Sequence, residues 1–263
     1  MSAKKINYGS YLRLNELLAL QQPLSDPAEH DEMLFIVIHQ VYELWFKQLL
    51  HELSKVRADL VTGDLYGAIH SFKRTRMIMK TLVGQLDILE TMTPLSFNSF
   101  RARLEQSSGF QSVQFREVEF LLGYKRAELL RHHPEGSAEY RALQKRLHEM
   151  SIVDALYDFL EDNGAEIPPA LRERDVTERN EPNVQLQTAL VRIYRERPDL
   201  AILLELMTDF DEGFQEWRYR HVKVVERTIG FKQGTGGSLG VPFLKESLFN
   251  PIFPDLWAIR GRF

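Results

Sequence analysis

The chain has 263 residues, a net charge of −4 and a pI near 6.1, and 44% of its residues are hydrophobic. This composition is typical of a globular protein that buries a large core. The acidic balance argues against a nucleic-acid partner, because a surface that follows phosphates needs a basic excess. The sequence contains no cysteine, which excludes disulfides, zinc–thiolate sites, iron–sulfur clusters, covalently attached c-type haem and thiolate-ligated haem.

Targeting signals are not evident in the sequence. Lys4 and Lys5 near the start are not followed by an apolar stretch, so we expect no signal peptide. The longest apolar run, 33–38, ends at His39 and is far too short to span a membrane. We therefore expect a cytoplasmic protein without membrane contact.

The pattern of apolar residues predicts an all-α protein. Apolar side chains recur at spacings of three and four almost throughout, and the alternation typical of strands is scarce. Polar residues and three prolines mark 163–182 as a long connection. We do not expect a domain boundary there, because the apolar helices on both sides need partners. The helices that we expect cover 11–20, 28–60, 65–91, 97–104, 113–122, a stretch after Ser137, 184–194 and 199–228.

Three helix starts can be predicted from their capping residues. Asp26 followed by Pro27 indicates the start of the long helix 28–60, since an acceptor side chain is followed by a residue with a helical φ. Ser96 is expected to cap 97–104, and Ser137 the helix after Pro134.

One helix carries a regular apolar stripe that includes a histidine. Its spacing of 3, 4, 3, 4, 3, 4 places His221 on the buried face, where it is either a core histidine or an axial metal ligand. Burial and the nearby Arg218, Arg220 and Lys223 favour the neutral imidazole. These cations either form a solvated flank of the helix or, where the metal is the iron of a haem, pair with the propionates of that haem. The stripe consists of Met207, Phe210, Phe214, Trp217, His221, Val224 and Thr228.

A second pair of candidates lies in the long helix 28–60. Phe35 and His39 are four residues apart and therefore share one side of the helix. Each alone is typical of a protein core. Together they offer an aromatic wall and a polar group, as a flat heteroaromatic ligand with one N–H requires.

Two further features could recognise a charged ligand. The glycine-rich segment 230–240 is neither a Walker A loop nor a dinucleotide fingerprint, so it is either a connection or a lid whose N–H groups and Thr235 hydroxyl meet a carboxylate or ammonium. Arg101, just ahead of Ser107-Ser108-Gly109, is either a surface arginine or a bidentate clamp on a carboxylate.

The order of these features resembles the tryptophan 2,3-dioxygenase family. The matching blocks are Tyr8-Gly9-Ser10-Tyr11-Leu12-Arg13-Leu14, Gln21-Gln22-Pro23-Leu24-Ser25, 30–45, Ser107-Ser108-Gly109-Phe110-Gln111-Ser112, Trp217-Arg218-Tyr219-Arg220-His221 and 230–237. The resemblance runs from about residue 7 to the C-terminal tail. It implies one all-α, haem-binding dioxygenase domain over 1–263, one haem b per subunit, and a homotetramer, expected as a dimer of dimers.

The resemblance also implies roles for individual residues. His221 matches the proximal haem ligand, and His39 the distal histidine that contacts the indole N–H. Phe35 matches the residue that lines the indole pocket, Arg101 the partner of the substrate carboxylate, and Thr235 a loop residue near the substrate's ammonium and carboxylate. Ser108 matches a distal-pocket serine near the haem. Tyr8 and Tyr11, in a segment of about residues 1–20, match tyrosines that reach into a neighbouring subunit's pocket.

Two positions depart from the family pattern. Phe97 stands where some members have Tyr, which preserves the ring and removes a hydroxyl. Leu86 stands where some members have Trp. Both changes affect the shape of the pocket rather than the attachment of the haem.

The reaction implied by the resemblance uses the Fe(II) form of the haem and O2 as co-substrate. Both oxygen atoms enter L-tryptophan, the pyrrole ring of the indole opens, and N-formyl-L-kynurenine leaves, as in the first step of the kynurenine pathway. The alternatives are a relative that oxidises a substituted tryptophan or another aromatic amino acid, a relative that inserts one oxygen atom, a non-catalytic haem or amino-acid sensor, and a helical scaffold without a cofactor.

Overall fold

The computed structural model describes residues 5–232, 234 and 240–263, and no strand occurs among them. The predicted all-α fold is therefore confirmed. The α-helices are α1 Tyr8–Leu12, α2 Leu14–Leu17, α3 His30–Val61, α4 Leu65–Leu89, α5 Pro94–Arg101, α6 Val113–Leu121, α7 Ala138–His148, α8 Ile152–Asp162, α9 Pro169–Glu173, α10 Val184–Glu196, α11 Pro198–Ile229, α12 Val241–Glu246 and α13 Pro254–Ala258. The 3-10 turns are η1 Ala102–Leu104, η2 Gly109–Gln111, η3 Ala127–His132 and η4 Arg260–Arg262.

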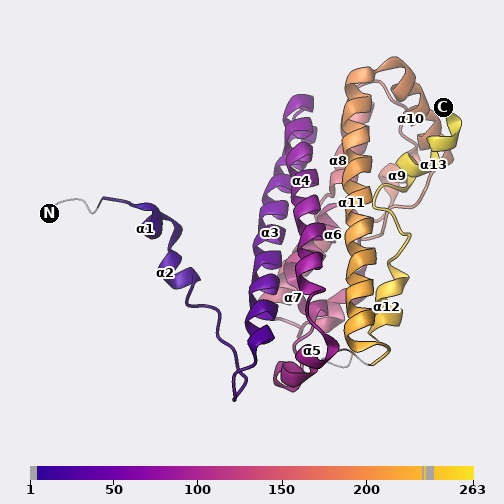
Figure 1. Cartoon of the computed structure of the whole chain (residues 1–263). Helices are drawn as coiled ribbons and strands as arrows, with labels where there is room; N and C mark the ends of the chain where they lie inside the picture. The colour runs from indigo at the N-terminus through magenta and orange to yellow at the C-terminus, as the bar shows by residue number, and fades with distance from the viewer. Residues whose placement is uncertain (1–4, 233, 235–239) are drawn as a thin grey trace.

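Three long helices, α3, α4 and α11, form the frame of the molecule. They run side by side, with α4 packed against both α3 and α11 (Figure 1). Each buries apolar residues at spacings of three and four, so one stripe of every helix faces the others. The shared core includes Leu49, Leu53 and Val56 from α3, Phe72, Met79 and Leu82 from α4, and Met207, Phe210 and Phe214 from α11.

Shorter helices cover this frame, and most begin at a capping side chain. α6 and α8 pack against α3, and α7 packs against α6. Ser137 caps α7 through a bond from the Tyr140 N–H, as expected, and Ser151 caps α8. The helix α8 is an addition to the sequence expectation. The expected long connection 163–182 is present and contains only the short helix α9.

The expected starts of two helices were wrong. α3 begins at His30 rather than at 28, and neither Asp26 nor the N-cap Glu29 caps it with a side chain. The Glu32 carboxylate, in the first turn of α3, instead accepts bonds from the preceding backbone. α5 begins at Pro94, because Thr93 rather than Ser96 is its N-cap. Pro94 therefore starts a helix, as its fixed φ allows.

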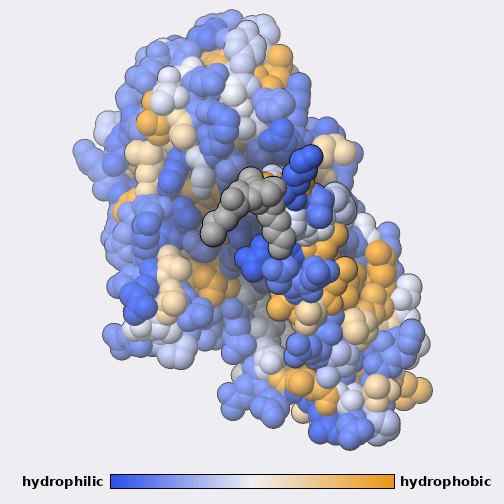
Figure 2. Space-filling model, turned by 90° about the vertical axis from the view of Figure 1, so that its left-hand side faces the viewer, coloured by the Kyte–Doolittle hydropathy of each residue, from blue (hydrophilic) through white to orange (hydrophobic). Residues whose placement is uncertain are grey.

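The N-terminal arm, residues 5–24, projects away from the helical body (Figure 1). The expected helix 11–20 is broken into α1 and α2 by Arg13, whose φ of 52° is left-handed. At the base of the arm, Gln40 of α3 donates to the Leu20 carbonyl and accepts a bond from Gln21. Figure 2 shows apolar patches among polar side chains on the side from which the arm leaves.

Membrane insertion of a helix finds no support in the structure. Within residues 5–232, 234 and 240–263, no helix has the length and apolar character that crossing a bilayer requires.

Candidate functional site

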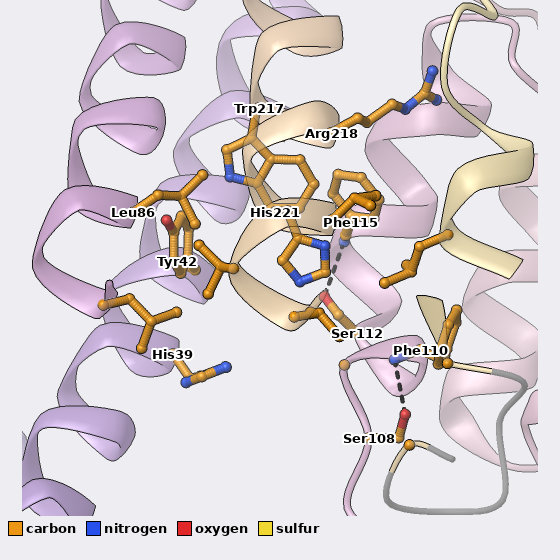
Figure 3. A pocket seen from close by; sticks show the side chains of 18 of the residues that line it. His39, Tyr42, Leu86, Ser108, Phe110, Ser112, Phe115, Trp217, Arg218 and His221 are labelled. Carbon is orange, nitrogen blue, oxygen red and sulfur yellow. Dashed lines mark hydrogen bonds between the residues drawn. The ribbon is translucent and has the colours of Figure 1, made fainter. Parts of the chain in front are cut away.

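A cavity of about 290 Å³ lies where α3, α4, α5, α6, α11 and α12 converge (Figure 3). This volume is near the lower end for small-molecule sites, roughly 300–1,000 Å³. Most of its wall is apolar. The aromatic and aliphatic residues include Phe35, Tyr42, Phe46, Leu86, Leu89, Met92, Phe97, Phe110, Phe115, Trp217, Val222, Val224 and Phe243, and the polar ones include His39, Glu43, Arg101, Ser108, Ser112, Arg116, Glu119, Arg126, Arg218 and His221.

His221 reaches this cavity from the middle of the last long helix, α11. The predicted stripe on α11 is present, and Met207, Phe210, Phe214, Trp217 and Val224 on it are buried. The His221 ring lies parallel to the Trp217 indole, at an interplanar angle of 3° and 5.1 Å between centroids. The imidazole is thus held by packing and borders the cavity rather than the solid core (Figure 3).

The surroundings of His221 keep its ring neutral. Burial lowers the pKa of His221 to about 4, and the nearby charges of His39 and Arg116 add to the effect. A neutral imidazole has a free nitrogen lone pair at physiological pH, which is the form that binds iron.

His39 enters the cavity from α3. Its Nδ1–H donates to the Phe35 carbonyl oxygen, 2.7 Å away, since a carbonyl can only accept. Burial lowers the pKa of His39, although its hydrogen bond and Glu43 act in the opposite direction. The His39 side chain is exposed to the space of the cavity that it borders. The neutral ring therefore presents an unprotonated Nε2, which can accept a hydrogen bond.

Aromatic rings form the wall next to His39. The centroid of Phe35 lies 4.0 Å from that of His39, 5.8 Å from that of Phe97 and 5.5 Å from that of Phe100. Phe97 and Phe100 meet edge to face at 5.4 Å. Phe97 and Leu86 are the two positions that depart from the family pattern. Phe97 lines the cavity as part of this aromatic cluster, and Leu86 lines it from α4 with no exposed surface.

Arg101 and Ser108 line the same cavity from consecutive segments. Arg101 is the last residue of α5. Ser108 is the N-cap of η2, and its Oγ accepts a bond from the Phe110 N–H at 3.3 Å (Figure 3). The structure thus brings Phe35, His39, Arg101, Ser108 and His221 to one cavity.

Two other predicted site residues, Tyr8 and Tyr11, do not line this cavity. Tyr8 and Tyr11 lie on α1 in the arm, with 76% and 75% of their surface exposed. Thr235 lies outside the residues that the structure describes, although Gly234 and Gly240 on either side line the cavity.

The three cations near His221 separate into two groups. Arg218 is buried and lines the cavity. Arg220 instead pairs with Asp87 of α4 and with Glu90, the C-cap of that helix, and Lys223 pairs with Glu226 one turn along α11. Arg220 and Lys223 thus lie on a solvated flank of α11, whereas Arg218 faces the interior.

Sequence reasoning missed several polar residues of the cavity wall. Glu43, one turn after His39, accepts bonds from the Ser112 hydroxyl at 2.5 Å and the Gln114 amide at 2.8 Å. Arg116 and Glu119 on α6 also line the cavity. Their signal in the sequence was two opposite charges, three residues apart, beside the apolar residues of α6.

These residues fit a haem. A neutral imidazole that borders a largely apolar, aromatic-lined cavity is a suitable axial nitrogen ligand, and the absence of cysteine leaves histidine as the natural one. His221 would hold the iron. His39 and Phe35, on α3, would face a second ligand.

The fold and site define an all-α protein whose largely apolar, aromatic-lined cavity is bordered by two histidines, His39 and His221. The sequence model of the tryptophan 2,3-dioxygenase family matches residues 1–141 and 173–262. This chain belongs to that family. Among its relatives named tryptophan 2,3-dioxygenase, the one from Herpetosiphon aurantiacus is 53% identical over 98% of this chain and 99% of the relative. Those from Anaeromyxobacter sp. (strain K) and Arthrobacter sp. (strain FB24) are 48% and 42% identical, over 97% and 98% of this chain and 96% and 92% of the relatives.

Proposed function

We propose that this protein is a haem-dependent tryptophan 2,3-dioxygenase that converts L-tryptophan and O2 into N-formyl-L-kynurenine. The observation that carries the proposal is the placement of His221 and His39 on one largely apolar cavity, with Arg101 at its edge. In the proposal, residues 1–263 act as one domain and the reaction takes place in the cytoplasm.

The cofactor in this proposal is one haem b per subunit in its Fe(II) form, and His221 would hold its iron. Bound there, it would supply the activation of O2. The chain supplies the position of the ligand, because the parallel Trp217 ring fixes the plane of the His221 imidazole. Ser108 borders the same space and is assigned to the distal pocket near the haem.

His39 is proposed to recognise the indole. Because its Nδ1–H is used by the Phe35 carbonyl, its Nε2 accepts the indole N–H. The lowered pKa of His39 keeps this acceptor unprotonated. We assign His39 as the residue closest to the chemistry, and Phe35 as the ring that packs on the indole.

The amino-acid part of the substrate needs charged partners. We assign its carboxylate to Arg101, whose guanidinium can form two parallel hydrogen bonds. Thr235 is assigned to the ammonium and carboxylate as part of a loop that closes over the substrate and excludes water. Together these contacts orient the indole ring toward the cofactor, and orientation lowers the entropic part of the barrier.

We further propose that four copies assemble as a dimer of dimers in which Tyr8 and Tyr11 complete a neighbouring subunit's pocket. The arm supports this assignment, because it leaves several large apolar side chains exposed and has few contacts with its own body: Ile6, Tyr8, Tyr11, Leu18, Leu20 and Leu24. Removing residues 1–20 should lower the mass measured by light scattering and weaken L-tryptophan binding. An unchanged mass and affinity would contradict the assembly.

The reaction is tested by incubating the ferrous, haem-loaded protein with L-tryptophan and ¹⁸O2. We expect N-formyl-L-kynurenine with two labelled oxygen atoms, identified by mass spectrometry. A product with one labelled atom would replace the proposal with a mono-oxygenating relative, and tight binding without turnover would indicate a sensor. Substituted tryptophans and other aromatic amino acids, assayed in parallel, establish which substrate is preferred.

A further inference from the structure

Beside His221, the cavity wall contains a cluster of four charged side chains, Arg116 and Glu119 from α6, Arg126, and Arg218 from α11. We call it the Arg116–Glu119–Arg126–Arg218 cluster. All four residues line the cavity. Glu119 and Arg218 are 1% and 3% exposed, so the charges are withdrawn from bulk water.

Glu119 is the centre of the cluster. Its carboxylate contacts Arg116 at 2.6 Å, Arg218 at 2.8 Å and Arg126 at 3.1 Å. Burial alone would raise the pKa of Glu119, but the three arginines outweigh burial and lower it to about 2. The carboxylate is therefore ionised.

The cluster carries more positive charge than its paired acid neutralises. Three guanidinium groups and one carboxylate sum to a net charge of +2. Two further acids are close enough to interact with the cluster. Asp211 acts on Arg218, but its oxygens accept bonds from the Ile252 and Phe253 backbone and from Trp257. The exposed Glu128 acts on Arg126 through its charge alone. Within residues 5–232, 234 and 240–263, none of the three arginines forms an ion pair with another acid. Buried charge without a counter-charge is costly, so a bound anion would stabilise it.

The three guanidinium groups of the cluster also have N–H donors that Glu119 does not use. Each guanidinium carries five N–H groups. Arg116 uses Nη1 on Glu119, and Arg126 uses Nη2 on the same carboxylate. The buried Nε–H of Arg126 has no hydrogen-bond partner in the described part of the chain. Arg218 uses one nitrogen on Glu119 and one on the Asn250 carbonyl.

The cluster is next to the proposed axial ligand. Arg218 precedes His221 by three residues, about one turn of α11. Arg116 is close enough for its charge to act on the His221 ring. A ligand held by His221 would therefore lie within reach of this part of the wall.

We propose that the Arg116–Glu119–Arg126–Arg218 cluster is a preassembled dianion site that binds the two carboxylates of the haem. The inference rests on the proposed haem function and adds the residues that would orient the ring in the cavity. The net charge of +2 matches two carboxylates. Glu119 contacts all three guanidinium groups and offsets one of their three positive charges.

The test compares two ligands that differ only in the carboxylates, protohaem IX and its dimethyl ester. The full chain, purified without haem and checked by circular dichroism, is titrated with each while the Soret band is recorded. The parent should bind protohaem at least tenfold more tightly than the ester, because charged hydrogen bonds contribute about 1.5–3 kcal/mol. The ratio of the two affinities cancels any loss of folded protein that a variant causes.

Single substitutions show which side chains cause the difference in affinity between protohaem and its ester. Arg126→Gln, at the edge of the cluster, and Arg218→Gln should each lower the affinity ratio roughly tenfold without weakening binding of the ester. Glu119→Gln, which leaves a net charge of +3, should not lower the ratio. Arg179→Gln is the matched control, because Arg179 also stacks on Tyr124 at 4.9 Å but does not line the cavity.

The outcomes separate this inference from the proposed function. Equal affinity of the parent for protohaem and its ester, with haem still bound, would overturn the dianion site and leave the proposed function standing. Failure of the parent to bind either ligand would overturn both. An L-tryptophan affinity that falls in Arg126→Gln while the haem-to-ester ratio is unchanged would assign the cluster to the substrate carboxylate and overturn the inference.

Discussion

The two walls of the cavity are built from different chemistry. The wall around His221, on α6 and α11, contains buried opposite charges, with Glu119 between three arginines. The wall around His39, on α3 and α5, is aromatic, with Phe35, Phe97 and Phe100 in contact. The wall around His221 is therefore charged and the wall around His39 is apolar, so the two sides of one cavity offer different contacts to a ligand.

The two histidines reflect this difference. His39 has its Nδ1–H bound to a backbone carbonyl, which assigns its tautomer and leaves Nε2 as an acceptor. His221 is oriented by stacking on Trp217. The same residue type is thus held by a hydrogen bond at one position and by ring stacking at the other.

The largest effect is expected in the pH dependence of stability of the haem-free protein. The pKa of His221 is lowered from 6.5 to about 4. Between these values the unfolded chain binds a proton that the folded chain does not, so the free energy of unfolding falls as the pH drops from about 6.5 to 4. Over the whole window the loss approaches about 3 kcal/mol.

Urea unfolding at pH 7 and pH 4.5 measures this dependence. His221→Leu should flatten it, whereas His148→Leu, at an exposed site on α7, should leave it as in the parent. Equal slopes in the parent and His221→Leu would contradict the neutral, buried imidazole.

A second prediction concerns Arg101. Arg101→Leu should weaken L-tryptophan binding about 100-fold, since removing one partner of a buried charge pair costs about 2–5 kcal/mol. Haem content should not change. Isothermal titration with L-tryptophan measures the loss, and Arg103→Leu, in the exposed turn η1, is the control. Parent-like affinity of Arg101→Leu would disprove the clamp.

A third, smaller effect is expected at His39. His39→Leu should weaken L-tryptophan binding roughly tenfold, the upper range for one hydrogen bond. The parent should discriminate against 1-methyl-L-tryptophan, which lacks the indole N–H, and His39→Leu should not. If the variant discriminated as strongly as the parent, Nε2 would not be the acceptor.

The smallest effect is expected at Phe97. Phe97→Tyr should change the KM for L-tryptophan by less than about threefold, because the ring lines the cavity and keeps its contacts with Phe35 and Phe100. Steady-state kinetics measure this. A tenfold change would mean that the hydroxyl takes a specific partner in the pocket.

The fold was largely predictable because helical periodicity is a local signal. The stripe on α11 placed His221 on a buried face, and the pair Phe35 and His39 was placed correctly on one side of α3. The starts of α3 and α5 were predicted wrongly, because Glu32 and Thr93 form contacts that compete with the caps expected at Asp26 and Ser96.

The candidate site was predictable only where one helix carries the pattern. Glu119 accepts bonds from Arg116 three residues away and from Arg218 at a separation of 99 residues. No local spacing reveals that second contact. Likewise, Glu43 and Ser112 are 69 residues apart. Such contacts depend on how α3, α6 and α11 pack, and sequence periodicity does not report this packing.

In the proposed function, His221 would hold the haem iron. The most direct measurement is the visible spectrum and haem content of His221→Ala, purified with haem supplied, beside the parent and His148→Ala. The account predicts loss of haem or a shifted Soret band in His221→Ala only, and recovery of the parent-like spectrum when imidazole is added. Unchanged haem content and an unchanged Soret position in His221→Ala would contradict it.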